Sequence, residues 1–148
     1  MTTGTNQQSE TEIREVIERR AAATRNKDAA AATAPFVSDV LTFDVVNPLQ
    51  HVGVDSVRPR TEQWFSSFIS PIGYEMRDLH VTAGDDVGFA HFMYRVSGTL
   101  VSGDELGMWN RATFCFRKID GEWRITHEHD SVPFDPETGL ASTTLEPA

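Results

Sequence analysis

The sequence predicts an α+β domain in which a cone-shaped, curved antiparallel sheet is covered by N-terminal helices. Two observations lead to this fold class. Helical periodicity is confined to the first half of the chain, and the second half holds four extended segments joined by short turns, which make an antiparallel sheet. Several of these segments far exceed the usual length of about five or six residues, so the sheet must twist and curl. Helices across the open side of a curled sheet enclose a cavity.

Three helices are expected in the first half. Ser9 and Glu12 have the spacing of a capping box, and behind them one helical face carries Ile13, Val16, Ile17, Arg20, Ala21 and Thr24. Asp28 can cap a short Ala-rich helix, which Pro35 ends. A third helix opens near Gly53 and turns an apolar stripe toward the core, formed by Val57, Thr61, Trp64, Phe65 and Phe68.

The strands are expected where β-branched and aromatic residues gather between turn signals. These segments are residues 40–46, 74–83, 87–100, 106–119 and 122–132. Between the last two, Asp120-Gly121 is the strongest hairpin signal in the chain, and it predicts a two-residue type I′ turn.

One domain, covering residues 9–134, accounts for all of these elements, as the length of 148 residues suggests. Residues 1–8 are polar and without pattern, and we expect them to form a disordered lead. Residues 135–148 carry few apolar side chains and are expected to form a loose tail.

The composition excludes several classes of function. The 13 basic and 22 acidic residues give a formal net charge of −9, which repels phosphate backbones and anionic membrane surfaces, so neither nucleic acid nor membrane is an expected partner. The apolar runs are far shorter than the ~20 residues that span a bilayer. The single cysteine, Cys115, has no partner for an internal disulfide, which fits a reducing cytoplasm. The chain has no Gly-rich phosphate loop, and no cofactor is expected.

The end of the expected sheet carries a recognisable motif. Asp120-Gly121-x-Trp123 is followed by His127-x-His129-x-Ser131. With the order of the helices and strands, this motif resembles the nuclear transport factor 2-like superfamily and, within it, the SnoaL-like branch. The C-terminal part also resembles the association (hub) domain of calcium/calmodulin-dependent protein kinase type II. The resemblance covers about residues 9–134.

The resemblance implies a cone with a deep pocket at its open end and, in most members, a homodimer. Members include isomerases, dehydratases, polyketide cyclases, non-catalytic binders and oligomerisation hubs, so the fold leaves the function open. The hub pocket uses three arginines. Only Arg95 falls on one of these positions here, and the other two are occupied by Phe114 and Asp130.

The same resemblance suggests which residues line the pocket. It places Arg95 on the inward face of its strand, and because side chains alternate along a strand, His91 comes to the same face. In the last two strands it turns Asn110, Phe114 and Asp130 inward. A single β-bulge would reverse this choice and turn His127 and His129 inward instead.

Asp130 and His91 are the candidate catalytic residues. A carboxylate in an apolar cone can have a raised pKa and act as an acid or a base, and histidine titrates near neutral pH. The cyclases and isomerases of the superfamily use an aspartate inside the cone, a role that Asp130 loosely matches. The alternative is a structural salt bridge between Asp130 and Arg95, and binding of a ligand without catalysis is a third possibility.

Three further features of the sequence bear on the pocket. Asp44 stands among apolar neighbours in the first strand, and Trp64 of the third helix can roof the cavity. The pair His127 and His129 could hold a metal ion, but a third ligand is missing from the pattern, so no metal is expected.

The function that fits these features is the binding of an apolar or aromatic small molecule by a homodimer. Its catalytic form is a cofactor-independent isomerase, dehydratase or cyclase that uses Asp/His acid–base chemistry. The alternative is a non-catalytic association module of the kinase-hub type. An open pocket with unpaired acid–base groups favours the first hypothesis, and a pocket filled by Phe114, Phe116 and Trp64 favours the second.

Overall fold

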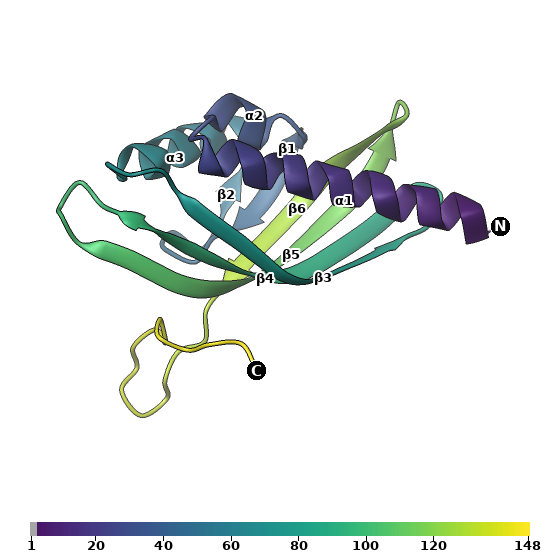
Figure 1. Ribbon diagram of the computed structural model, residues 1–148. Helices are drawn as coiled ribbons and strands as arrows, with labels where there is room; N and C mark the ends of the chain where they lie inside the picture. The colour runs from purple at the N-terminus through teal and green to yellow at the C-terminus, as the bar shows by residue number, and fades with distance from the viewer. Residues whose placement is uncertain (1–2) are drawn as a thin grey trace.

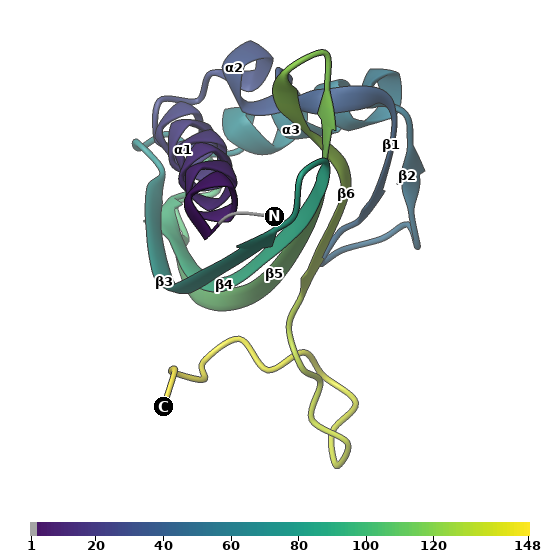
Figure 2. The same ribbon diagram turned by 90° about the vertical axis from the view of Figure 1, so that its right-hand side faces the viewer.

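The computed structural model describes residues 3–148 (Figures 1 and 2). Its elements in chain order are α1 (Thr3–Arg25), α2 (Ala29–Thr33), β1 (Phe36–Phe43), β2 (His51–Val52), α3 (Val54–Ser66), β3 (Gly73–Ala83), β4 (Val87–Thr99), β5 (Glu105–Ile119) and β6 (Glu122–Ser131). The predicted α+β class is confirmed, because the helices lie together over one side of a single curved sheet (Figure 1).

The sheet has six strands in the order β2-β1-β6-β5-β4-β3. All neighbouring pairs are antiparallel except β1 and β6, which run parallel. The β5–β6 hairpin turns at Asp120 and Gly121, with φ angles of 52° and 83°. Two successive positive φ values are what a type I′ turn requires, so the predicted hairpin is confirmed.

The elements differ from the sequence-based expectations mainly in the N-terminal half. The first strand begins four residues before the expected 40–46, and the two-residue strand β2 was not expected. Helix α1 begins at Thr3, so residues 3–8 are helical rather than a disordered lead, and Ser9 is a buried residue inside the helix instead of its cap. The prediction for residues 1 and 2 lies outside the described residues.

The C-terminal segment lies on the side of the sheet opposite the helices (Figures 1 and 2). It contains no helix or strand in its described residues. Two contacts nevertheless hold its end against the sheet: the Trp109 indole donates to Glu146, and the Arg77 guanidinium donates to the carbonyl of Ala148.

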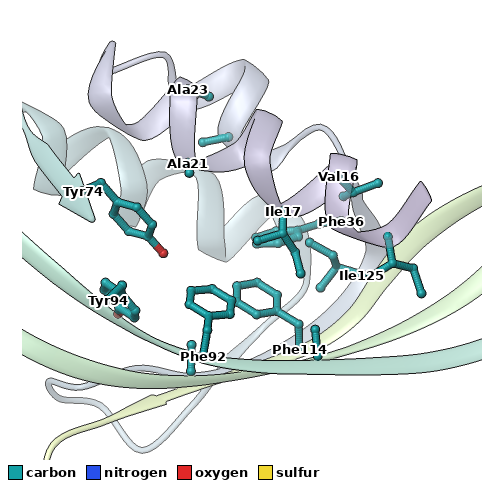
Figure 3. Close-up of a cluster of buried hydrophobic side chains, with 14 of the residues drawn as sticks. Val16, Ile17, Ala21, Ala23, Phe36, Tyr74, Phe92, Tyr94, Phe114 and Ile125 are labelled. Carbon is teal, nitrogen blue, oxygen red and sulfur yellow. The ribbon is translucent and has the colours of Figure 1, made fainter. Parts of the chain in front are cut away.

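The core lies between α1 and the concave face of the sheet (Figure 3). Ile13 and Ile17 of α1 are fully or almost fully buried. Beneath the helix, the rings of Phe92 and Phe114 stack with centroids 5.7 Å apart. This packing decides which side chains of the central strands face inward.

Alternation along the strands then defines the concave face. On β4 the inward set is Ala90, Phe92, Tyr94 and Val96, and on β5 it is Asn110, Ala112, Phe114 and Phe116. The β5–β6 register shifts between Cys115 and Phe116, so Ile125 and Glu128 both point inward although they are three residues apart. Because of this irregularity, the inward positions after Thr126 are Glu128 and Asp130.

Candidate active site

A cavity of about 200 Å³ lies at the wide end of the cone, beyond the stacked phenylalanines. Most of its wall is apolar and is contributed by α3, the central strands and the loop after β1: Val45, Val57, Trp64, Phe65, Val96, Leu106 and Met108. Helix α1 and all six strands contribute polar groups to it: Arg20, Thr42, His51, Tyr74, Tyr94, Asn110, Glu128 and Asp130. A largely apolar pocket with a few convergent polar groups is typical of a small-molecule site.

Asp130 is the central polar group of this site. The Tyr94 hydroxyl donates a hydrogen bond of 3.0 Å to its Oδ1, and its carboxyl group shares a second hydrogen bond with Glu128. Burial raises the pKa of Asp130 well above its usual range, and the neighbouring Glu128 raises it further. Asp130 therefore keeps its proton to a higher pH than an ordinary aspartate does, and it can act as a proton donor.

Arg20 supplies the positive charge beside this pair of carboxyl groups. Its Nη2 lies 3.1 Å from Glu128 Oε1, and its guanidinium lies over the rings of Phe36 and Phe114, 5.4 and 5.1 Å from their centroids. Burial alone would lower the pKa of Arg20, but the charge of Glu128 holds it above its usual value. The guanidinium thus remains a cation inside the core, held by an ion pair and two aromatic faces.

Tyr74 and Tyr94 stand next to each other, with centroids 4.8 Å apart and an interplanar angle of 18°. The two rings, labelled in Figure 3, come from the neighbouring antiparallel strands β3 and β4. Both side chains line the cavity. Burial raises the pKa of each phenol, so both hydroxyls stay protonated and can donate hydrogen bonds.

Four of the side chains expected in the pocket line the cavity: Asp44, Trp64, Asn110 and Asp130. Asp44 pairs with Arg60 at a distance of 3.5 Å, with about a quarter to a third of each side chain exposed. This places the Asp44–Arg60 pair nearer to solvent than the buried Asp130.

The predicted inward positions of His91 and Arg95 are wrong. His91 is exposed and packs against His80, and the guanidinium of Arg95 lies against the backbone of Gly107. The reason is the alternation along β4, where the larger apolar side chains Phe92 and Val96 take the concave face together with Tyr94. Neither the expected cluster of His91, Arg95 and Asp130 nor the Asp130–Arg95 salt bridge forms.

The other corrections concern the last two strands. Phe114 faces inward, but it belongs to the core beneath Arg20 rather than to the cavity wall. His127 and His129 lie on the opposite face, because the register shift turns their neighbours inward. The His127 ring bonds the carbonyl of Leu41 at 2.6 Å. Within residues 3–148, no three His, Cys, Asp or Glu side chains gather as a metal site would require.

Several site residues were missed from the sequence. Arg20 was placed on the apolar face of the first helix, and a lone cation among apolar positions was the signal that it pairs with a buried acid. Glu128 lies two residues before Asp130 on the same strand, so alternation along the strand was the signal that would have placed both on one face. Tyr74, Tyr94 and His51 carried no local signal, because only the folded sheet brings them to one cavity.

An α+β cone whose concave face holds a cavity with buried acid–base groups defines a nuclear transport factor 2-like fold. The SnoaL-like domain family matches residues 13–135, and the chain belongs to this family, within the nuclear transport factor 2-like superfamily. No curated protein matches the chain. Within residues 3–148, no helix has the length and apolar character needed to cross a membrane.

Solved structures share this fold. A nuclear transport factor 2-like protein of unknown function from Pseudomonas putida KT2440 is 33% identical, with a TM-score of 0.88 over 95% of this chain and 98% of that one. A proposed calcium/calmodulin-dependent protein kinase II association domain from Xanthomonas campestris is 18% identical, with a TM-score of 0.71 over 81% and 84% of the chains. A proposed dehydratase from Streptomyces avermitilis is 14% identical, with a TM-score of 0.73 over 82% and 93%.

Proposed function

We propose that the chain is a cofactor-independent proton-transfer enzyme that acts on a compact, largely apolar small molecule. Isomerisation, dehydration and cyclisation are the reactions of this class. The observation that carries the proposal is Asp130, a buried carboxyl group with a raised pKa that lines an otherwise largely apolar cavity between the Tyr94 hydroxyl and Glu128.

In this proposal Asp130 transfers the proton, and its neighbours determine whether its carboxyl group is protonated. As a neutral acid it donates to a carbonyl or hydroxyl oxygen of the substrate, and as a carboxylate it takes a proton from carbon. The Tyr94 hydroxyl already donates its proton to Asp130, so Tyr74 is the phenol of the cavity wall that we assign to a developing oxyanion. Arg20 and Glu128 compensate each other, so the site favours an uncharged substrate.

The size of the cavity limits the substrate. A cavity of about 150 Å³ holds a benzene molecule, so about 200 Å³ accommodates one ring with small substituents. The structural likeness to a proposed dehydratase is compatible with this class of reaction, although at 14% identity it speaks for the fold alone.

The association-module hypothesis is less well supported by the site. Phe114 and Phe116 are buried in the core and leave the cavity open, and Trp64 forms only part of its wall. Arg95, the one arginine at a hub position, lies on the other face of the sheet. The hub-type site binds a carboxylate through three arginines, and this cavity does not present arginines at those three positions.

A ring-opening probe tests the proposal without knowledge of the natural substrate. In 5-nitrobenzisoxazole, removal of the carbon-bound proton by a base breaks the N–O bond and releases a coloured cyanonitrophenolate. We expect the protein to accelerate this reaction, and Asp130→Asn to reduce the rate at least about 100-fold, the usual contribution of a positioned base. The pH–rate profile is expected to rise through a pKa well above that of a free aspartate.

The matched control is His91→Ala, which removes an exposed acid–base group from the opposite face of the sheet. We expect this variant to react at the rate of the unaltered protein. A reaction that is equally fast in the Asp130→Asn variant, or that is slowed by His91→Ala instead, would contradict the proposal.

We further propose that the chain forms a homodimer through the face of the sheet that the helices leave uncovered. Phe89 and Val87 of β4 lie on this face and are 45% and 55% exposed. The C-terminal segment on the same side adds Phe134 and Leu140, which are 66% and 67% exposed (Figure 1). Exposed apolar side chains on an uncovered side of a sheet, such as the neighbours Val87 and Phe89, are typical of an interface, and a second copy of the chain would supply the cover.

Sedimentation velocity tests the assembly. At micromolar concentration we expect a species of twice the 16.5 kDa chain mass, and Phe89→Asp is expected to shift it to a single chain. Leu49→Asp is the control, because Leu49 is 95% exposed in the loop after β1. A monomeric unaltered protein would contradict the proposed dimer, as would equal dissociation by both substitutions.

A further inference from the structure

His51 is a polar side chain of the cavity wall that the proton-transfer proposal does not use. It lies in the short strand β2, at the edge of the sheet, and its side chain lines the cavity. One ring nitrogen is engaged, because Nδ1 lies 3.1 Å from the Ser56 hydroxyl at the start of α3. The ring is therefore held in a fixed orientation between β2 and α3.

The register of the sheet places His51 in line with the acidic end of the site. Thr42 of β1 pairs with His51 on one side and with Glu128 on the other. His51, Thr42 and Glu128 are thus successive residues across three strands, and all three line the cavity. Two strand spacings separate the backbones of His51 and Glu128 by about 9–10 Å, and Asp130 follows two residues further along β6.

The second ring nitrogen of His51 has no hydrogen-bond partner within residues 3–148. Its Nε2 is buried and makes no hydrogen bond to the described residues. A buried polar atom without a partner is costly, and such atoms in native proteins call for an explanation, of which an absent ligand is one. Because this histidine lines the cavity, a ligand oxygen can satisfy the unpaired nitrogen.

We propose that His51 recognises a hydroxyl group on the substrate, at the end of the molecule away from Asp130. This inference rests on the proposed function and narrows its substrate class to a single-ring compound with two oxygen functions. One is a carbonyl or hydroxyl oxygen that meets the Asp130 proton, and the other is a hydroxyl that meets His51. A hydroxyl can both donate and accept, so it pairs with Nε2 in either tautomer of the ring.

Two ring compounds that differ only in this hydroxyl test the assignment. Calorimetric titration compares 4-hydroxyacetophenone with acetophenone, in which the carbonyl is common to both. We expect the unaltered protein to bind the hydroxylated compound about tenfold more tightly, as one buried hydrogen bond provides. In His51→Leu the preference is expected to fall to about twofold or less, whereas His51→Gln, which keeps a polar group near the Nε2 position, retains most of it.

Two controls keep the result interpretable. His91→Leu removes an exposed histidine from the opposite face and is expected to preserve the preference. If His51→Leu does not fold, His51→Ala takes its place, and the same loss of the preference is expected. Equal binding of both compounds by the unaltered protein, or binding of neither, overturns the assignment, as does an undiminished preference in His51→Leu.

The outcome is distinguishable from a failure of the proposed function. The reaction of 5-nitrobenzisoxazole depends on Asp130 and involves no hydroxyl for His51. An Asp130-dependent reaction without a hydroxyl preference overturns the role of His51 alone, whereas a reaction independent of Asp130 overturns the proposed function.

Discussion

Replacement of Arg20 by methionine is expected to lower the free energy of unfolding by about 3–5 kcal/mol at neutral pH, the usual cost of removing one partner of a buried ion pair. Arg20 and Glu128 are 3.1 Å apart, with side chains only 17% and 10% exposed. Methionine keeps the aliphatic contacts with the aromatic rings but leaves the Glu128 charge without a cation. Urea denaturation followed by circular dichroism measures the effect.

Two comparisons isolate the charge. Arg19→Met changes the exposed neighbour on the same helix and is expected to alter the free energy of unfolding by less than about 0.5 kcal/mol. The double variant Arg20→Met/Glu128→Gln removes both charges and is expected to recover part of the loss. If Arg20→Met lowered the free energy of unfolding no more than Arg19→Met does, the ion pair would not contribute appreciably to the stability of the fold.

Replacement of Asp130 by asparagine is expected to stabilise the protein increasingly as the pH rises above about 4. The folded-state pKa of Asp130 is raised by burial above the value of about 3.9 in the unfolded chain. Between these two values the unfolded state ionises while the folded state keeps its proton, so the unaltered protein loses stability with rising pH, by up to about 1.4 kcal/mol per pH unit. Asparagine does not ionise, so the free energy of unfolding of the Asp130→Asn variant does not show this decline with pH.

The substitution also preserves the local hydrogen bonds. The asparagine oxygen can accept from the Tyr94 hydroxyl as Oδ1 of Asp130 does, and its amide can donate to Glu128 as the shared proton does. Free energies of unfolding measured from pH 4 to pH 8 test this, with the exposed Asp39→Asn as control. Parallel curves for Asp130→Asn and the unaltered protein would show that Asp130 is not a buried neutral acid.

The local chemistry of the sequence determined much of the fold. Asp28 caps α2 through a bond of 3.0 Å to the amide of Ala31, and Asp120-Gly121 forms the hairpin turn, as their residue types predicted. These two features depend on neighbours along the chain or across one turn, and this is why the sequence alone sufficed for them. The inward position of Asp130, in contrast, was favoured by the resemblance to the hub domain, and Asp130 lies buried in the cavity.

The partner of Asp130 was decided only by tertiary packing. Along β4, the sequence offered two faces, and the resemblance favoured the one with His91 and Arg95. The folded chain buries Phe92, Tyr94 and Val96 instead, because the helical layer covers that face and the apolar rings fill the core beneath it. The cation of the site then comes from Arg20 of α1, 108 residues before its partner in the chain. Contacts over such a separation leave no periodic trace in a single sequence, so the site itself had to be read from the structure.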